Sequence, residues 1–237
     1  MLYPLTVPEK TGAIIMAAGA GRRMGGKPKS LLMRDGVPLI ERQLRALAQV
    51  GVCEAVVVLG HHTAHIEPVV AKLQSQLAGS MDIRWALNSQ PDDGPGSSLR
   101  VGLRALSPEL KAVLVTLADQ PLLESSDMSA VLAAWKSRAP GVELVVPIFE
   151  GEPGHPVVFG ALVRDAVVAM NGGAGLRDWR RAHADQVQAL AVDHARHTVD
   201  IDTEFDRVAL AECYGVALEW PANLDGDGIA SDGIRDR

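Results

Sequence analysis

The sequence has few cysteines, little aromatic content and no excess of positive charge. Cys53 and Cys213 are the only cysteines among 237 residues, so no disulfide framework or Cys-x-x-Cys pair is expected, and a reducing cytoplasmic compartment is favoured. A net charge of −6 disfavours nucleic acid as a partner. No apolar run reaches the roughly 18 residues of a membrane span. The first twelve residues lack the charged and apolar regions of a signal peptide, so we expect no membrane association.

Short apolar runs alternate with helical patterns through the first 140 residues. The runs at 13–18, 54–60, 82–87 and 111–118 predict strands. The stretches at 38–51, 64–78, 98–106 and 125–138 predict helices, the third capped by Ser97 or Ser98 and the fourth by its own Ser or Asp residues. This alternation predicts an α/β fold with a mainly parallel sheet covered on both faces.

The second part of the chain predicts a more mixed pattern. Residues 142–149 and 155–160 flank GEPG and predict a hairpin. The remaining elements are helices at 161–170, 176–184 and 203–215 and short strands at 188–192 and 199–202. No linker divides the chain, so we expect one domain over residues 1–215. Residues 198–237 carry ten acidic and three basic side chains, and residues 216–237 predict an acidic flexible tail.

Three loops follow predicted strands and contain the polar and glycine-rich chemistry. They come after residues 13–18, after 82–87 and after 111–118. Ligands of open parallel sheets bind beyond the carboxyl ends of the strands, so these loops predict the binding site. Residues 19–45 hold seven basic side chains against two acidic ones, which suits a compact polyanion such as a triphosphate. A solvated basic helix face is the alternative explanation of this charge.

The glycine loop resembles two nucleotide-binding motifs and matches neither. Gly19, Gly21 and Gly25 give GxGxxxG, which is one residue longer than the dinucleotide fingerprint and disfavours a nicotinamide-dependent reductase. Gly21 to Lys27 supply the first seven positions of a phosphate-binding P-loop. The eighth position is Pro28, which has neither a hydroxyl for magnesium nor an N–H for phosphate. A glycine turn followed by cations remains, which favours contact with phosphates.

Several motifs in order along residues 11–212 resemble the MobA-like nucleotidyltransferases, and most of all the molybdenum cofactor cytidylyltransferase type. The motifs are AAGxGxRMG(x)xPKxLL at 17–32, NxxxxxGxxSSLxxGL at 88–103, LADQPL at 117–122, GHPVVF at 154–159, and DIDT at 200–203 with Asp206. The resemblance implies a Rossmann-like three-layer sandwich with flanking helices. It also implies a nucleotide-binding half at about 11–120 and an acceptor-binding half at about 121–213.

The resemblance also implies roles for individual residues. Lys29, Arg23 and Asp119 match the catalytic positions, while Asp119 and Asp202 match the residues that bind magnesium. The nucleotide-binding positions correspond to Ala17, Ala18, Gly19, Gly21, Arg23, Lys29, Asn88, Gly94, Ser97 and Ser98. The acceptor side corresponds to Gln120, His155 and Arg177.

The implied reaction is the magnesium-dependent transfer of CMP from CTP to the terminal phosphate of molybdopterin. The AAG start of the loop favours CTP over GTP. Gly173 stands where the family usually has an acid, which leaves a different phosphorylated acceptor open. A carrier that brings finished cofactor to a molybdoenzyme, alone or with its chaperone, without turnover, is an alternative of another class. The intact Lys29, Asp119 and Asp202 disfavour it.

Each candidate side chain also has a structural explanation. Asp119 could cap the helix that follows it, and Ser97 and Ser98 could only cap theirs. Asp200 and Asp202 could lie in a solvated turn, and alternation along a strand would let one of them face the site. His155 could simply pack in a turn. For the zinc ligand candidates His61, His62 and His65, a solvated helix start is the favoured explanation.

Overall fold

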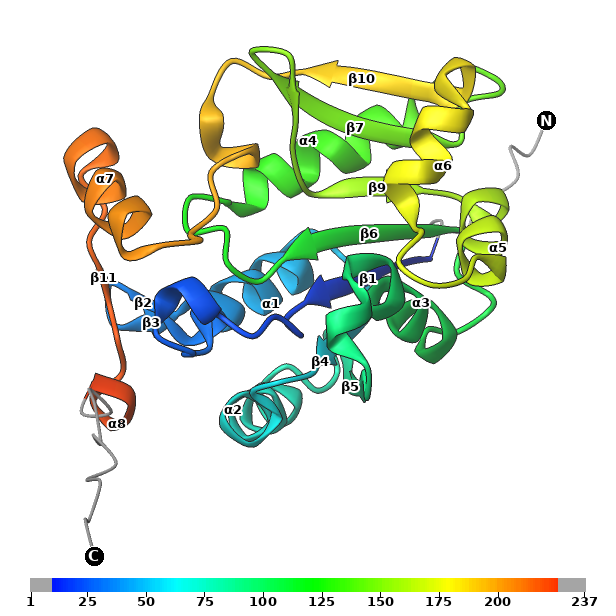
Figure 1. The fold of residues 1–237 in the computed structure, drawn as a ribbon. Coiled ribbons are helices and arrows are strands. Elements are labelled where there is room, and N and C mark those ends of the chain that lie inside the picture. The colour runs from blue at the N-terminus through cyan, green and yellow to red at the C-terminus, as the bar shows by residue number, and fades with distance from the viewer. Residues whose placement is uncertain (1–9, 226–237) are drawn as a thin grey trace, which may run out of the picture.

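The computed structural model describes residues 10–225, and its centre is an eight-stranded sheet (Figure 1). The strands are β1 (Thr11–Met16), β4 (Glu54–Leu59), β5 (Asp82–Leu87), β6 (Ala112–Leu117), β7 (Leu144–Phe149), β8 (Glu152–Pro153), β9 (Val157–Phe159) and β10 (Val187–Ala191). Their order is β10-β7-β9-β6-β1-β4-β5, with β8 paired to β7. Strands β6, β1, β4 and β5 are parallel, as is the pair β7 and β10, while β9 runs antiparallel to β6 and β7. The predicted α/β class, mainly parallel sheet and hairpin are confirmed.

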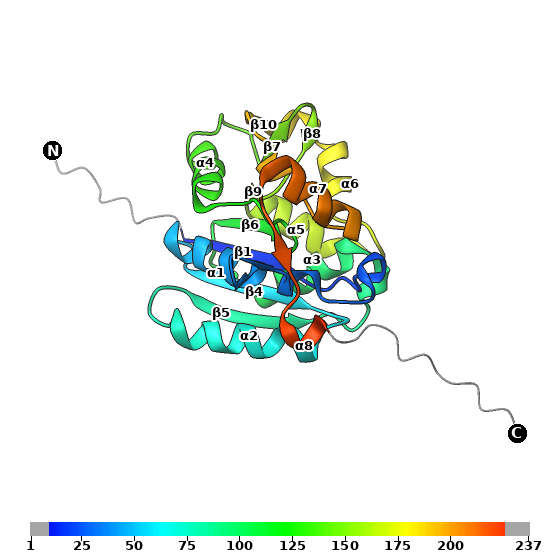
Figure 2. The same cartoon turned by 90° about the vertical axis from the view of Figure 1, so that its left-hand side faces the viewer.

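Helices cover both faces of this sheet and bury two separate cores (Figure 2). One face carries α1 (Leu39–Gln49), α2 (Thr63–Gln76) and α4 (Ser125–Lys136); the other carries α3 (Pro95–Ala105), α5 (Ala161–Ala169) and α6 (Leu176–Ala182). Because side chains alternate along a strand, Ile15 of β1 enters the first core and Ile14 the second. Both are fully buried, and each contributes about 1.5–3 kcal/mol. Among the helices of residues 10–225, none is long and apolar enough to cross a bilayer.

A third, smaller core joins the glycine loop to the end of the described chain. It contains Met24, Leu122, Ile201 and Leu218. The elements around it are β2 (Met33–Arg34), β3 (Val37–Pro38), α7 (Glu204–Tyr214) and β11 (Leu218–Glu219), and α8 (Ala222–Asp225) follows. Strand β11 pairs antiparallel with β2, so the predicted flexible tail is wrong for residues 216–225. Residues 226–237 of that tail lie outside the described residues.

Three local predictions are also wrong, for identifiable reasons. Residues 199–202 form no strand, because the Ile201 backbone N–H bonds the Asp119 carbonyl at 3.1 Å and its side chain enters the third core. Helix α3 begins before the serines, with Pro95 in its first turn and Gly94 at the N-cap. The N-cap of α4 is Glu124 rather than a Ser or Asp, and its backbone N–H donates to the Asp127 carboxylate at 2.9 Å.

Candidate active site

The three loops singled out in the sequence meet at one cavity of about 310 Å³. Strands β1 and β6 point toward the same edge of the sheet, where these loops leave it (Figure 1). Residues 16–19 span the end of β1 and the start of the loop after it, and residues 117–119 do the same for β6. Gly94 and Ser98 come from the loop and helix after β5. A cavity of this size at the carboxyl ends of parallel strands is a usual small-ligand site.

The glycine loop folds into two short 3₁₀ turns rather than into a P-loop. Gly21 adopts a left-handed φ of 60°, and a Cβ there would lie 2.0 Å from the Lys27 carbonyl oxygen. The turns cover Arg22–Met24 and Lys29–Leu31, so no α-helix starts at the P-loop position. Lys27 lies 5.3 Å from the centre of the Trp220 ring. The geometry therefore separates Lys27 from Lys29, whose side chain lines the cavity.

Lys29 lies between two carboxylates that are far apart in the sequence. Its Nζ forms an ion pair with Asp119 Oδ2 and lies 2.8 Å from Asp202 Oδ1. The Arg23 guanidinium contacts the other Asp202 oxygen at 2.5 Å. The Lys29 and Asp119 side chains are 17% and 18% exposed, against 38% for Asp202. The fold thus brings together the three predicted catalytic residues and both predicted metal ligands.

The neighbouring charges in this cluster shift the pKa values of Lys29, Asp200 and Asp202. Burial alone would lower the pKa of Lys29, but the charges and hydrogen bonds of Asp119 and Asp202 raise it above its ordinary value. Burial would raise the pKa of Asp202, but Lys29 and Arg23 together lower it. Burial, followed by repulsion from Asp119 and Asp202, raises the pKa of Asp200. Asp202 therefore ionises more readily than Asp200, whose carboxylate is repelled by Asp119 and Asp202.

A buried glutamine fixes the strand end that carries Asp119. Gln43 of α1 donates from Nε2 to the Leu117 carbonyl at 2.7 Å and accepts from the Thr116 hydroxyl at 2.6 Å. It is 2% exposed, so these bonds satisfy its amide inside the protein. Sequence reasoning missed Gln43, although a polar residue on the apolar face of the predicted helix 38–51 was the available signal.

Asp202 is held by the start of helix α7. The Asp206 carboxylate accepts from the backbone N–H groups of Asp202 at 3.0 Å and Thr203 at 2.7 Å. The Thr203 hydroxyl in turn accepts from the Asp206 N–H at 3.2 Å, which completes a capping box. The DIDT motif and Asp206 thus have a structural purpose, namely to fix the backbone that presents Asp202.

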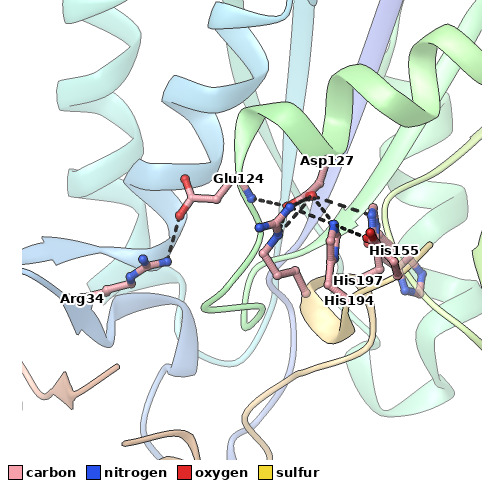
Figure 3. A network of polar contacts seen from close by, with 8 residues as sticks. Arg34, Glu124, Asp127, His155, His194 and His197 are labelled. Carbon is pink, nitrogen blue, oxygen red and sulfur yellow. Dashed lines mark hydrogen bonds and ion pairs between the residues drawn. The ribbon is translucent and has the colours of Figure 1, made fainter. Parts of the chain in front are cut away.

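The structure excludes one alternative explanation of Asp119. It does not cap a helix, since the next helix, α4, begins at Ser125. The loop between them is instead braced by Arg34, which donates to the Pro121 carbonyl at 3.0 Å and to Glu124 Oε1 at 2.9 Å. Figure 3 shows the Arg34–Glu124 contact. The Asp119 side chain is therefore free for the cavity and for Lys29.

Asn88, Ser97 and Ser98 form a buried hydrogen-bonded group beside the cavity. The Asn88 amide donates to both serine hydroxyls, at 2.8 and 2.9 Å, and its Oδ1 accepts from the Gln90 N–H at 3.0 Å. Of the three, Ser98 lines the cavity. The serines therefore join the loop after β5 to α3 instead of capping the helix. Their contact with nucleotide stays a prediction.

The residues predicted for the acceptor side divide into two groups. His155 and Arg177 line a second cavity of about 270 Å³ together with Arg180. Burial, and then the positive charge of Arg180, lower the pKa of His155 to about 4, so its ring is neutral at pH 7. Gln120 does not line this cavity: it is 3% exposed and donates from Nε2 to the His197 carbonyl at 2.8 Å.

A buried arginine links the loop at residues 172–175 to helix α3, beside the first cavity. Arg100 of α3 donates to the Ala174 carbonyl at 2.5 Å and also to the Gly172 carbonyl. A Cβ on Gly96 would lie 2.2 Å from the Ala174 oxygen, so the loop contacts the first turn of α3 directly. Sequence reasoning missed Arg100, because nothing in its helix pattern marks a buried charge.

Comparison with known proteins identifies a family and several relatives. A model of the MobA-like NTP transferase domain matches residues 13–187. The bifunctional protein GlmU of Rhodococcus opacus strain B4 is 28% identical over 208 residues, which are 87% of this chain and 40% of GlmU. GlmU of Mycobacterium leprae strain Br4923 is 30% identical over 162 residues, 68% of this chain and 32% of that protein. The chain therefore spans two fifths or less of the length of these curated relatives.

Solved structures show the same fold. Rv0371c from Mycobacterium tuberculosis H37Rv has a TM-score of 0.68 and 24% identity, covering 86% of this chain and 98% of that one. Rv0371c has also been crystallised in complex with manganese, and that structure has a TM-score of 0.62 and 23% identity over the same shares. The nucleotidyl transferase Mth528 from Methanothermobacter has a TM-score of 0.64 and 24% identity, covering 86% and 97%.

Proposed function

The chain belongs to the MobA-like NTP transferase domain family, and on that premise we propose that it moves CMP from CTP to the terminal phosphate of molybdopterin. Pyrophosphate is the second product. The observation that carries the proposal is Lys29, held between Asp119 and Asp202 at the wall of the cavity. A cation bracketed by carboxylates at the carboxyl edge of a parallel sheet suits a triphosphate with its divalent metal.

The nucleotide lies in the first cavity, against the backbone of residues 17–19. Small residues there let backbone N–H groups approach phosphate oxygens closely. Lys29 and Arg23 turn from the carboxylates toward the triphosphate and neutralise its charge. Gly94 and Ser98 line the wall from which the base or ribose is contacted.

Magnesium fits the donor set of this structure. Asp119 and Asp202 present oxygens to the same cation, Lys29 Nζ, so their negative charges face one point. Hard divalent cations prefer such oxygens. The manganese complex of Rv0371c gives independent support for a divalent metal in this family. Asp119 and Asp202 would hold the ion, which neutralises phosphate charge when bound.

The transfer is an in-line displacement at the α-phosphorus of CTP. A terminal phosphate oxygen of the acceptor attacks, the bond to the bridging oxygen breaks, and pyrophosphate leaves with its electron pair. The nucleophile is already an anion, so no strong general base is needed. The protein therefore contributes position and charge: Lys29 and Arg23 stabilise the negative charge that the reaction rearranges.

The second cavity is the proposed acceptor side. Arg177 and Arg180 provide positive charge there, while His155 is a neutral hydrogen-bonding partner. Gly173 removes the acid of the family pattern at the neighbouring loop, and this difference favours testing other phosphorylated acceptors and GTP beside CTP and molybdopterin.

Pyrophosphate release with magnesium and each NTP, with and without molybdopterin, tests the proposal. We expect release that needs both CTP and molybdopterin, and its loss in Asp119→Asn. Asp165→Asn is the matched control, since Asp165 is an exposed carboxylate on α5. Release with GTP alone among the nucleotides contradicts the base assignment. Release with another phosphorylated acceptor contradicts the acceptor assignment, and no release with any NTP favours a non-catalytic carrier.

A further inference from the structure

Asp127, His194 and His197 form a second polar cluster, and none of the three lines the cavity beside Lys29. Asp127 lies in the first turn of α4, while His194 precedes the 3₁₀ turn Ala195–His197 after β10 and His197 ends it (Figure 3). One nitrogen or oxygen from each residue lies within 4.8 Å of the others. The cluster lines its own cavity of about 550 Å³, separate from the nucleotide and acceptor cavities.

The hydrogen bonds of His197 direct an unshared electron pair at the carboxylate. Its Nδ1 lies 3.0 Å from the His155 carbonyl oxygen, which only accepts, so Nδ1 carries the proton. In the neutral ring Nε2 then has the lone pair, and it faces Asp127 Oδ1 at 3.9 Å. A lone pair and a carboxylate oxygen repel each other unless a cation lies near both.

Arg196 supplies that cation in this structure. Its Nη2 donates to Asp127 Oδ1 and to His194 Nε2, both at 2.8 Å, and its Nε donates to Asp127 Oδ2 at 3.0 Å. Nε2 of His194 is thus also an acceptor, and it lies 3.4 Å from Asp127 Oδ1. The Asp127 side chain is only 2% exposed, whereas that of Arg196 is 37% exposed and borders the cavity. The guanidinium therefore has room to leave.

We propose that Asp127, His194 and His197 bind a divalent transition metal of the zinc class, which displaces the Arg196 guanidinium from the point on which their ligand atoms converge. Tetrahedral zinc bonds to nitrogen and oxygen of about 2.0–2.2 Å place ligand atoms roughly 3.3–3.6 Å apart. The His194–Asp127 pair already has this spacing, at 3.4 Å. The His197–Asp127 pair, at 3.9 Å, closes by about 0.3–0.6 Å to meet the same geometry.

The donor set selects the metal. Two imidazoles and one carboxylate favour zinc and similar ions over magnesium, which prefers oxygen. Partners behind the ligands already hold two of them in place: the Glu124 N–H bonds Asp127 Oδ2 at 2.9 Å, and the His155 carbonyl orients His197. The adjoining cavity leaves the fourth position to solvent. The site does not rest on the proposed nucleotidyl transfer, and its test needs no substrate.

Calorimetric titration of chelator-treated full-length protein with Zn²⁺ tests the site, with Co²⁺ absorption reporting the ligand geometry. We expect one equivalent of Zn²⁺ to bind, with no competition from a large excess of Mg²⁺. His194→Ala should weaken binding at least about 10-fold, because it removes a ligand. Arg196→Gln should strengthen binding about 10-fold, because it removes the competing cation while leaving all three ligands.

His65→Ala is the matched control, since His65 is an exposed histidine on α2 outside the cluster, and it should leave binding unchanged. Thermal unfolding of each metal-free variant shows that it is folded. The absence of one-equivalent binding from both the wild type and Arg196→Gln overturns the site and leaves an Arg196–Asp127 ion pair. Equal binding by His194→Ala, or loss of binding in His65→Ala, overturns the assignment of the ligands.

Discussion

The two halves of the sheet contribute to the candidate active site in different ways. The half with β1, β4, β5 and β6 contributes mostly main chain and apolar wall, at loops that leave parallel strands on one edge. The half with β7, β9 and β10 contributes Asp202 from the segment between β10 and α7, and residues 172–175 from the connection between α5 and α6. The first half forms the cavity and contributes Lys29 and Asp119, and the second half adds the Asp202 carboxylate.

This difference shows where the site depends on long-range contacts. Strand direction alone places Gly19 and Asp119 at one edge. Asp202 reaches the same point only because Ile201 bonds the Asp119 carbonyl and enters the third core. Substitutions at the contacts between the halves should therefore show which contacts are needed for turnover and which are needed for the stability of the fold.

The largest expected effect follows from removing the cation shared by the two halves. Lys29→Gln leaves Asp119 and Asp202 facing each other and the triphosphate without its lysine, so turnover should fall on the order of 100-fold or more. Asp202→Asn should cause a comparable loss if the second half supplies a metal ligand. Steady-state pyrophosphate release measures both. A near-normal rate in Asp202→Asn alone would confine the catalytic machinery to the first half.

Gly96→Ala should disturb the contact between the halves and destabilise the whole protein. Its Cβ would lie 2.2 Å from the Ala174 oxygen and 2.6 Å from the Gly173 oxygen. Both are backbone atoms, so the backbone of the loop would have to shift to make room. We expect a loss of about 1–3 kcal/mol in the free energy of unfolding, measured with urea. Gly19→Ala is the control, since a Cβ there meets nothing within 4 Å. Equal stability of the two variants would show that the loop at 172–175 moves freely.

Asp200→Asn should stabilise the protein at neutral pH. The folded-state pKa of Asp200 is raised, so its charged form costs stability above that pKa, and the cost disappears below the unfolded value of about 3.9. The gain should stay below about 1 kcal/mol because the side chain is exposed, and should vanish as the pH falls toward 4. Thermal unfolding against pH measures it.

Asp202→Asn provides the opposite sign in the same experiment. The folded-state pKa of Asp202 is lowered, so its stabilising charge is present above the unfolded value and is lost as the pH falls through the folded one. This variant should be less stable than the wild type at pH 7 and equal to it at low pH. The same sign of change for both carboxylates would contradict the assigned charge pattern.

The smallest expected effect concerns the lysine of the apparent P-loop. Lys27→Gln removes the cation over the Trp220 ring and should lower the free energy of unfolding by about 0.5 kcal/mol. Turnover should stay within about twofold of the wild type, in contrast to Lys29→Gln. A large loss of turnover would show that Lys27 contacts the triphosphate as Lys29 is proposed to do, and would contradict their different roles.

The sequence predicts the first half well because its signals are local. Buried strands there are continuous apolar runs, and ligand loops in such sheets follow strand ends, so the positions of Gly19, Asp119 and Gly94 required no knowledge of distant contacts. The resemblance to a family added Asp202, which the runs alone do not join to Asp119.

The missed features depend on residues far apart in the chain. Gln43 bonds Thr116, Arg100 bonds residues near 172, and Asp127 meets His194 and His197, each across 67 or more positions. The only histidine pattern that the sequence offers as a metal site is at 61–65. In the structure His61 contacts Asp92 and His62 contacts the Ala20 carbonyl, so these two side chains have other partners. Local spacing carries no information on such pairs.

Arg100 has a consequence for how this protein and its relatives diverge. It holds the loop at 172–175 through the carbonyl oxygens of Gly172 and Ala174, which every amino acid possesses. A side chain exchanged at Ala174 leaves both hydrogen bonds in place. The backbone of this loop is therefore held independently of its side chains, so single substitutions can change the surface that the loop presents without altering its path.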